Sequence, residues 1–226
     1  MNKLFRIWVV LMMFALGLAG RAGAQEISHQ VNFPSGDAAW SVSFETGEDY
    51  GQDSAPKPKP NARQMSKIDI VRMGDLRHDI LTWSDGNTTE YWWEPKLQVV
   101  LLQDNNDTRV HAAKAGNMDA SRFDDSLFTW VSASTFKGLK PFHGTLCRTY
   151  GMDITTLMGE VIHLRAWIDN KTGRPLAWSN SGIINVFSFD QPLPQTPLVL
   201  PPNFQATLTQ VRAFMNVPKP VSANGL

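Results

Sequence analysis

Cysteine is nearly absent from this sequence. Cys147 is the only cysteine among 226 residues, so an intramolecular disulfide and a cysteine-based metal cluster are both excluded. No neighbouring motif would activate its thiol, and the run around it alternates apolar and polar residues. We therefore predict that Cys147 is a buried structural thiol and not a reactive nucleophile.

The motifs of common enzymes are missing too. The chain has no Gly-x-Ser-x-Gly elbow, no Walker loop, no His-Glu-x-x-His and no dinucleotide glycine fingerprint. His78 and Asp79 are adjacent, so on a strand they point to opposite faces and cannot form a local pair. The acidic runs at 104–107 and 124–125 lack the spacing and the glycine of an EF-hand loop. We expect no catalytic residue, no metal site and no cofactor. A metal site built from distant histidines, or a hydrolase that uses distant Asp and His residues, remains an alternative.

An excess of charge of one sign is also lacking. The chain holds 21 basic and 21 acidic residues. Three of the basic residues fall within residues 1–24, which leaves 18 against 21 and a net charge of −3 from residue 25 onward. Without a basic patch the chain has no electrostatic footprint for nucleic acid, so we expect no nucleic-acid partner.

The first 24 residues have the order of a signal peptide. Lys3 and Arg6 form a basic start, residues 7–20 form an apolar stretch too short for a comfortable membrane span, and residues 22–24 read Ala-Gly-Ala. We predict cleavage before Gln25 and export to the periplasm or the extracellular space; a buried N-terminal helix is the alternative. Arg21 stands where a lipoprotein box would need cysteine, so we expect a soluble product with only transient membrane contact.

From residue 25 to 217 the sequence predicts one mainly β domain with about eight antiparallel strands. Trp40, Val42 and Phe44 alternate with polar residues, which is typical of a half-buried strand. Residues 46–61 contain a proline–lysine run and are expected to form an exposed loop, and residues 218–226 a disordered tail. The expected strands cover 38–45, 67–73, 76–83, 88–93, 96–103, 144–150, 160–169, 174–180 and 183–189.

Two helices are expected beside the sheet. Residues 118–135 space Phe123, Leu127 and Trp130 on one helical face, with 111–117 as a loop that leads into this helix. Residues 203–215 predict a terminal helix capped by Asn203. Several strands carry apolar groups on both faces, so the predicted fold is a curved antiparallel sheet or incomplete β-barrel, covered by one or two helices.

One segment carries a family resemblance. Residues 166–176 read Ala-Trp-Ile-Asp-Asn-Lys-Thr-Gly-Arg-Pro-Leu. This resembles the strand–turn–strand motif W-I-D-x-x-T-G-x-P of the periplasmic lipoprotein carriers of the LolA/LolB-like superfamily. The order of export signal, first strand and hairpins is similar as well, over residues 38–190. The chain departs from that pattern in the proline–lysine insertion and in having no amphipathic helix before the first strand. The resemblance implies an incomplete barrel whose open side is closed by helices, and a carrier function.

Tryptophan is unusually frequent, and large aromatic side chains line pockets as well as cores. We expect the curved sheet to enclose a hollow for a hydrophobic small molecule or a lipid, closed by the 118–135 helix. An envelope assembly or interaction module that docks a partner protein is the second hypothesis. For any single tryptophan, packing in the core is the alternative to ligand contact. The predicted ligand-binding residues are Trp40, Phe44, Trp83, Tyr91, Trp93, Trp130, Trp167 and Trp178.

Overall fold

The computed structural model describes residues 27–46, 63–115, 123–180 and 182–215. The predicted signal peptide, nearly all of the proline–lysine loop and the predicted tail lie outside the described residues. Eleven strands form one sheet, which confirms the mainly β, antiparallel class. The strands are β1 (Ala38–Thr46), β2 (Met65–Met73), β3 (Leu76–Trp83), β4 (Thr88–Glu94), β5 (Val99–Asp104), β6 (His111–Lys114), β7 (Phe136–Phe142), β8 (Thr145–Thr155), β9 (Val161–Asp169), β10 (Pro175–Asn180) and β11 (Ile183–Ser188).

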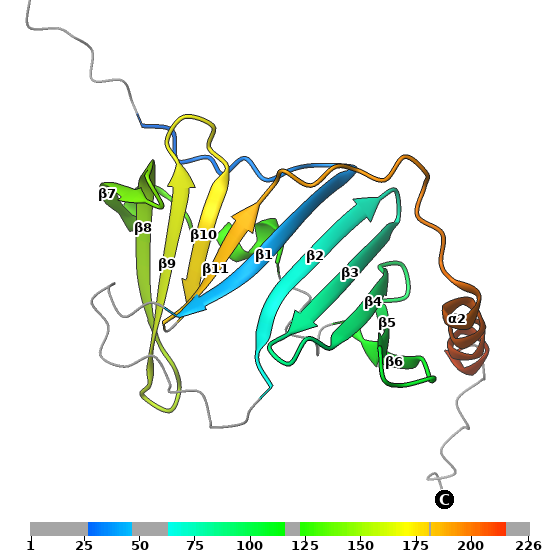
Figure 1. Cartoon of the computed structure of the whole chain (residues 1–226). Coiled ribbons are helices and arrows are strands. Elements are labelled where there is room, and N and C mark those ends of the chain that lie inside the picture. Colours follow the sequence, from blue (N-terminus) through cyan, green and yellow to red (C-terminus); the bar gives the residue numbers. More distant parts are fainter. Residues whose placement is uncertain (1–26, 47–62, 116–122, 181, 216–226) are drawn as a thin grey trace, which may run out of the picture.

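The sheet is unclosed and consists of two meanders. Its strand order is β6-β5-β4-β3-β2-β1-β11-β10-β9-β8-β7, and every pair is antiparallel (Figure 1). All neighbours are consecutive in sequence except β1 and β11, which pair from Ser41 opposite Ser188 to Thr46 opposite Ile183. The two outermost strands, β6 and β7, therefore lie at opposite edges, and the sheet does not close into a barrel.

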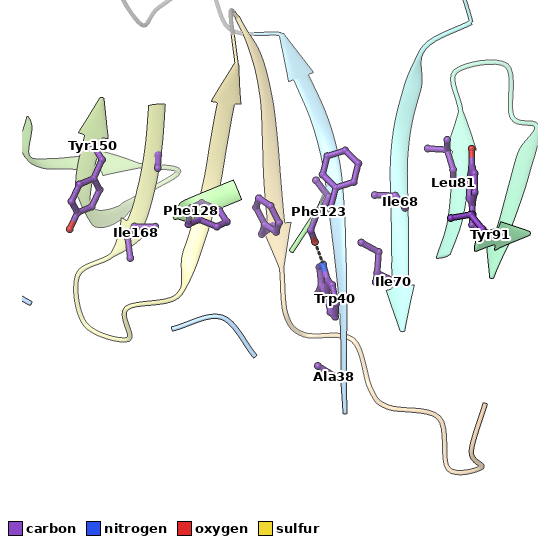
Figure 2. Close-up of a cluster of buried hydrophobic side chains, with 14 residues drawn as sticks. Ala38, Trp40, Ile68, Ile70, Leu81, Tyr91, Phe123, Phe128, Tyr150 and Ile168 are labelled. Atoms are coloured by element: carbon purple, nitrogen blue, oxygen red, sulfur yellow. Dashed lines mark hydrogen bonds between the residues drawn. The ribbon is translucent and has the colours of Figure 1, made fainter. Parts of the chain in front are cut away.

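Alternation along the strands sorts the side chains onto two faces, because successive residues point to opposite sides. We call the face that carries Trp40 on β1, Ile68 on β2 and Ile168 on β9 the inner face, and the opposite one the outer face. The main hydrophobic cluster covers the inner face from Tyr91 on one side to Tyr150 on the other (Figure 2). The alternation predicted for Trp40, Val42 and Phe44 is confirmed by these faces.

The segment before β7 packs on the inner face, but the helix predicted at 118–135 is wrong for the residues that are described. Residues 123–135 contain two short 3₁₀ helices, η3 (Asp125–Phe128) and η4 (Ala133–Thr135). The Asp124 carboxylate accepts a hydrogen bond from the Ser126 backbone N–H, and the Ser132 backbone N–H donates to the Thr135 hydroxyl. Such local bonds compete with an α-helix. Phe123 and Phe128 are nonetheless buried in the inner cluster.

Residues 27–37 run along one end of the inner face (Figure 1). The backbone N–H of Asn32 donates to the carbonyl of Gly173 at 2.8 Å, beyond the end of β9. Further along, the Arg72 guanidinium of β2 donates to the carbonyls of Pro34 and Gly36 at 2.6 and 2.9 Å. This N-terminal segment therefore links the β9–β10 turn to the β2–β3 end of the sheet.

The terminal helix α2 (Pro202–Met215) packs on the outer face. Phe204 and Leu208 are buried against Trp92 and Leu101 of β4 and β5. The helix begins at Pro202, which suits the first turn, where its missing N–H costs nothing. Asn203 therefore lies inside the helix and does not cap it, contrary to the prediction; its side chain donates to Gln103. In the part of the chain that is described, α2 is the one α-helix, and the inner face is covered by the segment that contains η3 and η4 instead of by an α-helix.

Two strands were missed. Residues 111–114 form β6 and not a loop, and residues 136–142, including Pro141, form β7, where no strand was expected. Both are edge strands, where four residues suffice and where a proline need not donate to a neighbour. The turn of the W-I-D-x-x-T-G-x-P segment forms as expected: Asp169 accepts from the backbone N–H groups of Lys171 and Thr172, and β10 begins at Pro175.

Candidate functional site

The structure brings seven of the eight predicted aromatic residues to one face. Trp40 and Tyr91 are buried in the inner cluster, and five others pack against it: Phe44, Trp83, Trp93, Trp130 and Trp178. Trp167 is the exception. It points to the outer face, where it packs with Phe142 and Cys147, because it alternates with Ala166 and Ile168 on β9. Trp167 therefore does not share a site with the other seven.

Most of the indole N–H groups on the inner face already have partners. Trp40 Nε1 donates to the carbonyl of Phe123 at 2.9 Å (Figure 2), and Trp83 Nε1 donates to the Thr89 hydroxyl at 2.8 Å. Trp130 Nε1 donates to the carbonyl of Leu127 at 2.8 Å. Buried indoles that are satisfied in this way anchor the core. Trp178 differs, since its buried Nε1 has no hydrogen-bond partner among the described residues.

A buried carboxylate lies at the β2–β5 end of the inner face. Asp79 has no exposed surface, and it accepts hydrogen bonds from Arg77 Nε and Trp93 Nε1, both at 2.8 Å. Arg77 Nη1 also lies 3.5 Å from Oδ2 of Asp124, the residue that caps the start of η3. Burial raises the pKa of Asp79, and the neighbouring guanidinium opposes that rise. Sequence reasoning missed this set, although the spacing of Arg77, Asp79 and Leu81 places all three on the core face.

Beside this ion pair lies a cavity of 620 Å³. Arg72, Arg77, Asp75 and Asp124 bring charges of both signs to its walls beside apolar side chains such as Leu76 and Val99, so it is a mixed cavity and not the purely apolar hollow that was expected. Trp93 is the one predicted aromatic residue in its lining. The centre of the inner face is instead filled by the protein's own side chains, including Phe123 and Phe128.

The opposite end of the inner face is apolar and less covered. On β8 and β9, Met152 pairs with Leu164, and Ile154 pairs with Ile162, on the same face as Tyr150. These side chains are half-buried or exposed and do not belong to the inner cluster. We call this surface the apolar wall and define it by five residues: Met152, Ile154, Ile162, Leu164 and Ile183 of β11.

The β8–β9 hairpin extends this apolar surface beyond the wall. At its tip Leu157 is fully exposed, and Met158 has 89% of its surface exposed. The tip turns at Gly159, whose φ of 81° is favourable for glycine. Adjacent large apolar side chains at a tip are costly in water, and such surfaces commonly mark contact with a partner or a membrane.

The histidines and Cys147 form no catalytic constellation in the described ranges. His78 pairs with Glu90 at 2.9 Å and stacks on Trp92 on the outer face, while Asp79 points inward, as predicted. His163 pairs with Asp153 at 2.9 Å on the exposed part of the hairpin. Among the described residues no group of three His, Cys, Asp or Glu side chains could hold a metal ion.

The thiol of Cys147 is buried, as predicted, and burial raises its pKa to about 11. A thiol with that pKa stays protonated at neutral pH and is a poor nucleophile. Its sulfur contacts the carbonyl of Thr145 at 3.3 Å.

None of the described helices has the length and apolar character needed to cross a membrane. No protein-family model matches the sequence, and no curated protein matches it. Among solved structures, the crystal structure of the Mycobacterium tuberculosis lipoprotein LppX is similar with a TM-score of 0.40 and 11% sequence identity, over 71% of this chain and 89% of that chain. At that TM-score the likeness carries no argument about ligand or activity. The predicted fold class, an unclosed antiparallel sheet, is confirmed by the strand order itself.

Proposed function

We propose that this is an exported protein of the cell envelope that binds an apolar chain, such as the acyl chain of a lipid or lipoprotein, along the apolar wall. The observation that carries the proposal is the wall itself. Aliphatic side chains from three strands share one face outside the packed core, and Ile154 leaves 41% of its surface exposed. Water is a poor solvent for such a surface, and an acyl chain is a ligand of matching chemistry.

The magnitudes favour binding. A chain of about 14 methylenes releases roughly 11 kcal/mol on full transfer from water, at about 0.8 kcal/mol for each CH₂. Association costs at least about 4 kcal/mol in lost freedom of motion. With an association cost at this lower end, shielding about half of the chain on the wall leaves a net attraction of roughly 1–2 kcal/mol, and fuller shielding leaves more. Trp178, which lies on the same face and whose indole N–H has no partner among the described residues, would report the ligand by its fluorescence.

The test is a titration with a fluorescent fatty acid, dansyl-undecanoic acid, against the chain from Gln25 onward. We expect binding that Ile154→Gln weakens. Ile80→Gln is the matched control, since Ile80 is 39% exposed but points to the outer face. The proposal fails if the wild-type chain does not bind the probe, or if the two variants lose affinity equally. Native mass spectrometry of protein purified from its own envelope would identify a retained lipid.

Export is part of the proposal and is supported by the order of basic start, apolar stretch and Ala-Gly-Ala at residues 22–24. N-terminal sequencing of the protein from the periplasmic fraction should find Gln25 first. A product that still begins at Met1 in that fraction would contradict the cleavage.

The exposed hairpin tip favours a second candidate, an interaction module of the envelope. In this case Leu157 and Met158 dock a partner protein. A photo-crosslinking amino acid placed at position 157 in living cells separates the two candidates. A covalent adduct with one defined protein would support docking, and adducts with lipid alone would support the carrier function.

A further inference from the structure

A second buried charge of the inner face, that of Arg148, differs from Asp79 in having no partner of opposite sign. Arg148 lies on β8 opposite Ile168 and is only 4% exposed. Its Nη2 donates to the backbone carbonyl of Gln30 at 3.2 Å, and its buried Nε has no hydrogen-bond partner within the described ranges. No described carboxylate lies within ion-pair distance of this guanidinium.

A buried guanidinium without a counter-charge and with an unpartnered N–H group destabilises the folded state. Taking a charge out of water is unfavourable unless a counter-charge and hydrogen bonds replace the lost water. One neutral carbonyl satisfies only one of the five N–H donors that arginine carries. The environment of Arg148 is therefore incomplete in a way that a bound anion would complete.

A cavity of 410 Å³ opens beside this guanidinium. Its walls come from the N-terminal segment, from β8 and from the turn after β9, and they include Arg148, Lys171, Ser28 and Thr172. Among the described residues, the lining holds two cations, Arg148 and Lys171, and no carboxylate. The charged side chains described in this lining are therefore all positive, whereas the cavity around Arg77 is lined by side chains of both signs.

Gly173, in the wall of this cavity, allows Asn32 and Arg148 to approach the turn closely. A Cβ at this position would lie 2.5 Å from Asn32 Nδ2 and 3.3 Å from Arg148 Nη2. Asn32 Nδ2 itself donates to the carbonyl of Thr172 at 2.7 Å and so fixes the N-terminal segment over the turn. The absence of a side chain at Gly173 allows the segment and the guanidinium to meet at the cavity wall.

We propose that this cavity binds a phosphate-class oxyanion, with Arg148 as the fixed donor and Lys171 as the mobile second cation. A planar guanidinium matches the oxygens of a phosphate in a two-pronged arrangement, and an ammonium adds charge without demanding geometry. The volume exceeds that of a bare phosphate, so the phosphate of a small phosphorylated metabolite or of a lipid headgroup fits the same chemistry. The site is independent of the apolar wall and does not rest on the proposed carrier function.

The experiment is isothermal titration calorimetry of the chain from Gln25 onward with three probes: inorganic phosphate, glycerol 3-phosphate and dihexanoyl phosphatidic acid below its micellar concentration. Binding of the first two without the third assigns a soluble phosphate. Binding of the third alone assigns a lipid headgroup when Arg148→Gln weakens it and Ile154→Gln, which alters the apolar wall, does not. Either result supports the shared chemistry. Failure of all three probes to bind overturns the proposal.

Three variants test the residues. Because a hydrogen bond to a charged group is strong, Arg148→Gln should weaken binding of the active probe about 10- to 100-fold. Lys171→Gln should weaken it about 2- to 10-fold, since an exposed charge contributes less. Arg174→Gln, the matched control, removes an exposed cation that lies outside the lining and should leave the affinity unchanged. Equal affinity in the Arg148→Gln and Lys171→Gln variants and the wild type would overturn the assignment.

Thermal melting without ligand separates a binding role from a structural one. If Arg148 is held for a ligand, Arg148→Gln keeps or raises the melting temperature, because it removes an uncompensated buried charge. A large fall in melting temperature, with unchanged anion affinity in the Lys171→Gln variant, would show that the arginine is structural and would overturn the site.

Discussion

The indole Nε1 of Trp93 donates a hydrogen bond to the buried carboxylate of Asp79 at 2.8 Å, from one strand to the next. The second oxygen of that carboxylate accepts from Arg77 Nε, which lies two residues earlier on the same strand and face. A predicted ligand-binding tryptophan is thus part of a polar network that satisfies a charge inside the sheet. Its role in the fold follows from this bond whether or not it also meets a ligand.

The first prediction concerns that network. Asp79→Leu should lower the free energy of unfolding by about 1–3 kcal/mol, because it removes the buried acceptor of Arg77 Nε and Trp93 Nε1 while Asp124 still faces the guanidinium. The double variant Arg77→Met/Asp79→Leu should recover part of this loss. Urea denaturation of the wild type, the two single variants Arg77→Met and Asp79→Leu, and the double variant measures the coupling. A single variant as stable as the wild type would show that the pair is not energetically important.

The second prediction contrasts two tryptophans. Trp40→Phe should lower the free energy of unfolding by at least about 2 kcal/mol, because it leaves the buried carbonyl of Phe123 without its donor and opens a gap. Trp178→Phe removes an indole N–H that has no partner among the described residues, so the loss should be smaller. The same denaturation experiment compares them. Equal losses of unfolding free energy in the two variants would contradict the stabilising role assigned to the hydrogen bond between Trp40 and Phe123.

The third prediction is the inertness of Cys147. With a pKa of about 11, roughly one thiol in 1,000 is ionised at pH 8, against about one in ten for an ordinary thiol. Its reaction with iodoacetamide in the folded protein should be at least about 100-fold slower than in urea. The rate should keep rising with pH towards 11, since the thiolate is the reacting form. A fast reaction at pH 7 in the folded state would refute the assignment.

The fourth prediction uses two glycines. Gly86→Ala introduces a side chain at a φ of +83° with nothing within 4 Å, so it should cost only the conformational strain of about 1–2 kcal/mol. Gly173→Ala adds a clash with Asn32 to similar strain and should cost at least about 1 kcal/mol more. Differential scanning calorimetry measures both variants. Equal melting temperatures would mean that Asn32 moves aside freely.

Local patterns predicted much of this fold. The alternation of Trp40, Val42 and Phe44 predicted the two faces of β1, and the W-I-D-x-x-T-G-x-P segment predicted the turn before β10, because each of these signals acts within a few residues. The helix expected at 118–135 failed because Asp124, Ser132 and Thr135 bond to nearby backbone and side chains, which a count of apolar spacing ignores. The short edge strand β6 offered too few residues to show a period.

The candidate sites depended on contacts far apart in the chain. Arg148 stands in the run Thr-Leu-Cys-Arg-Thr-Tyr at a position that alternation places on the same face as Tyr150, and a lone arginine on a core face was the available signal. What a sequence pattern does not contain is the partner, Gln30, more than a hundred residues away. Alternation along β9 places Trp167 on the opposite face from Ala166 and Ile168. The predicted site nevertheless included Trp167, because that prediction was based on residue type and not on the face that each tryptophan occupies.

The pairing of β1 with β11 has a consequence for how the chain could be divided. It is the single junction in the sheet between strands that are not sequence neighbours, and it spans six residue pairs. A protein cut between β6 and η3 would yield two pieces, each with its hairpins intact. Helix α2 of the C-terminal piece would still pack against β4 and β5 of the N-terminal piece. Coexpressed as separate polypeptides, the two pieces should reassemble without a covalent link, like the halves of a split reporter.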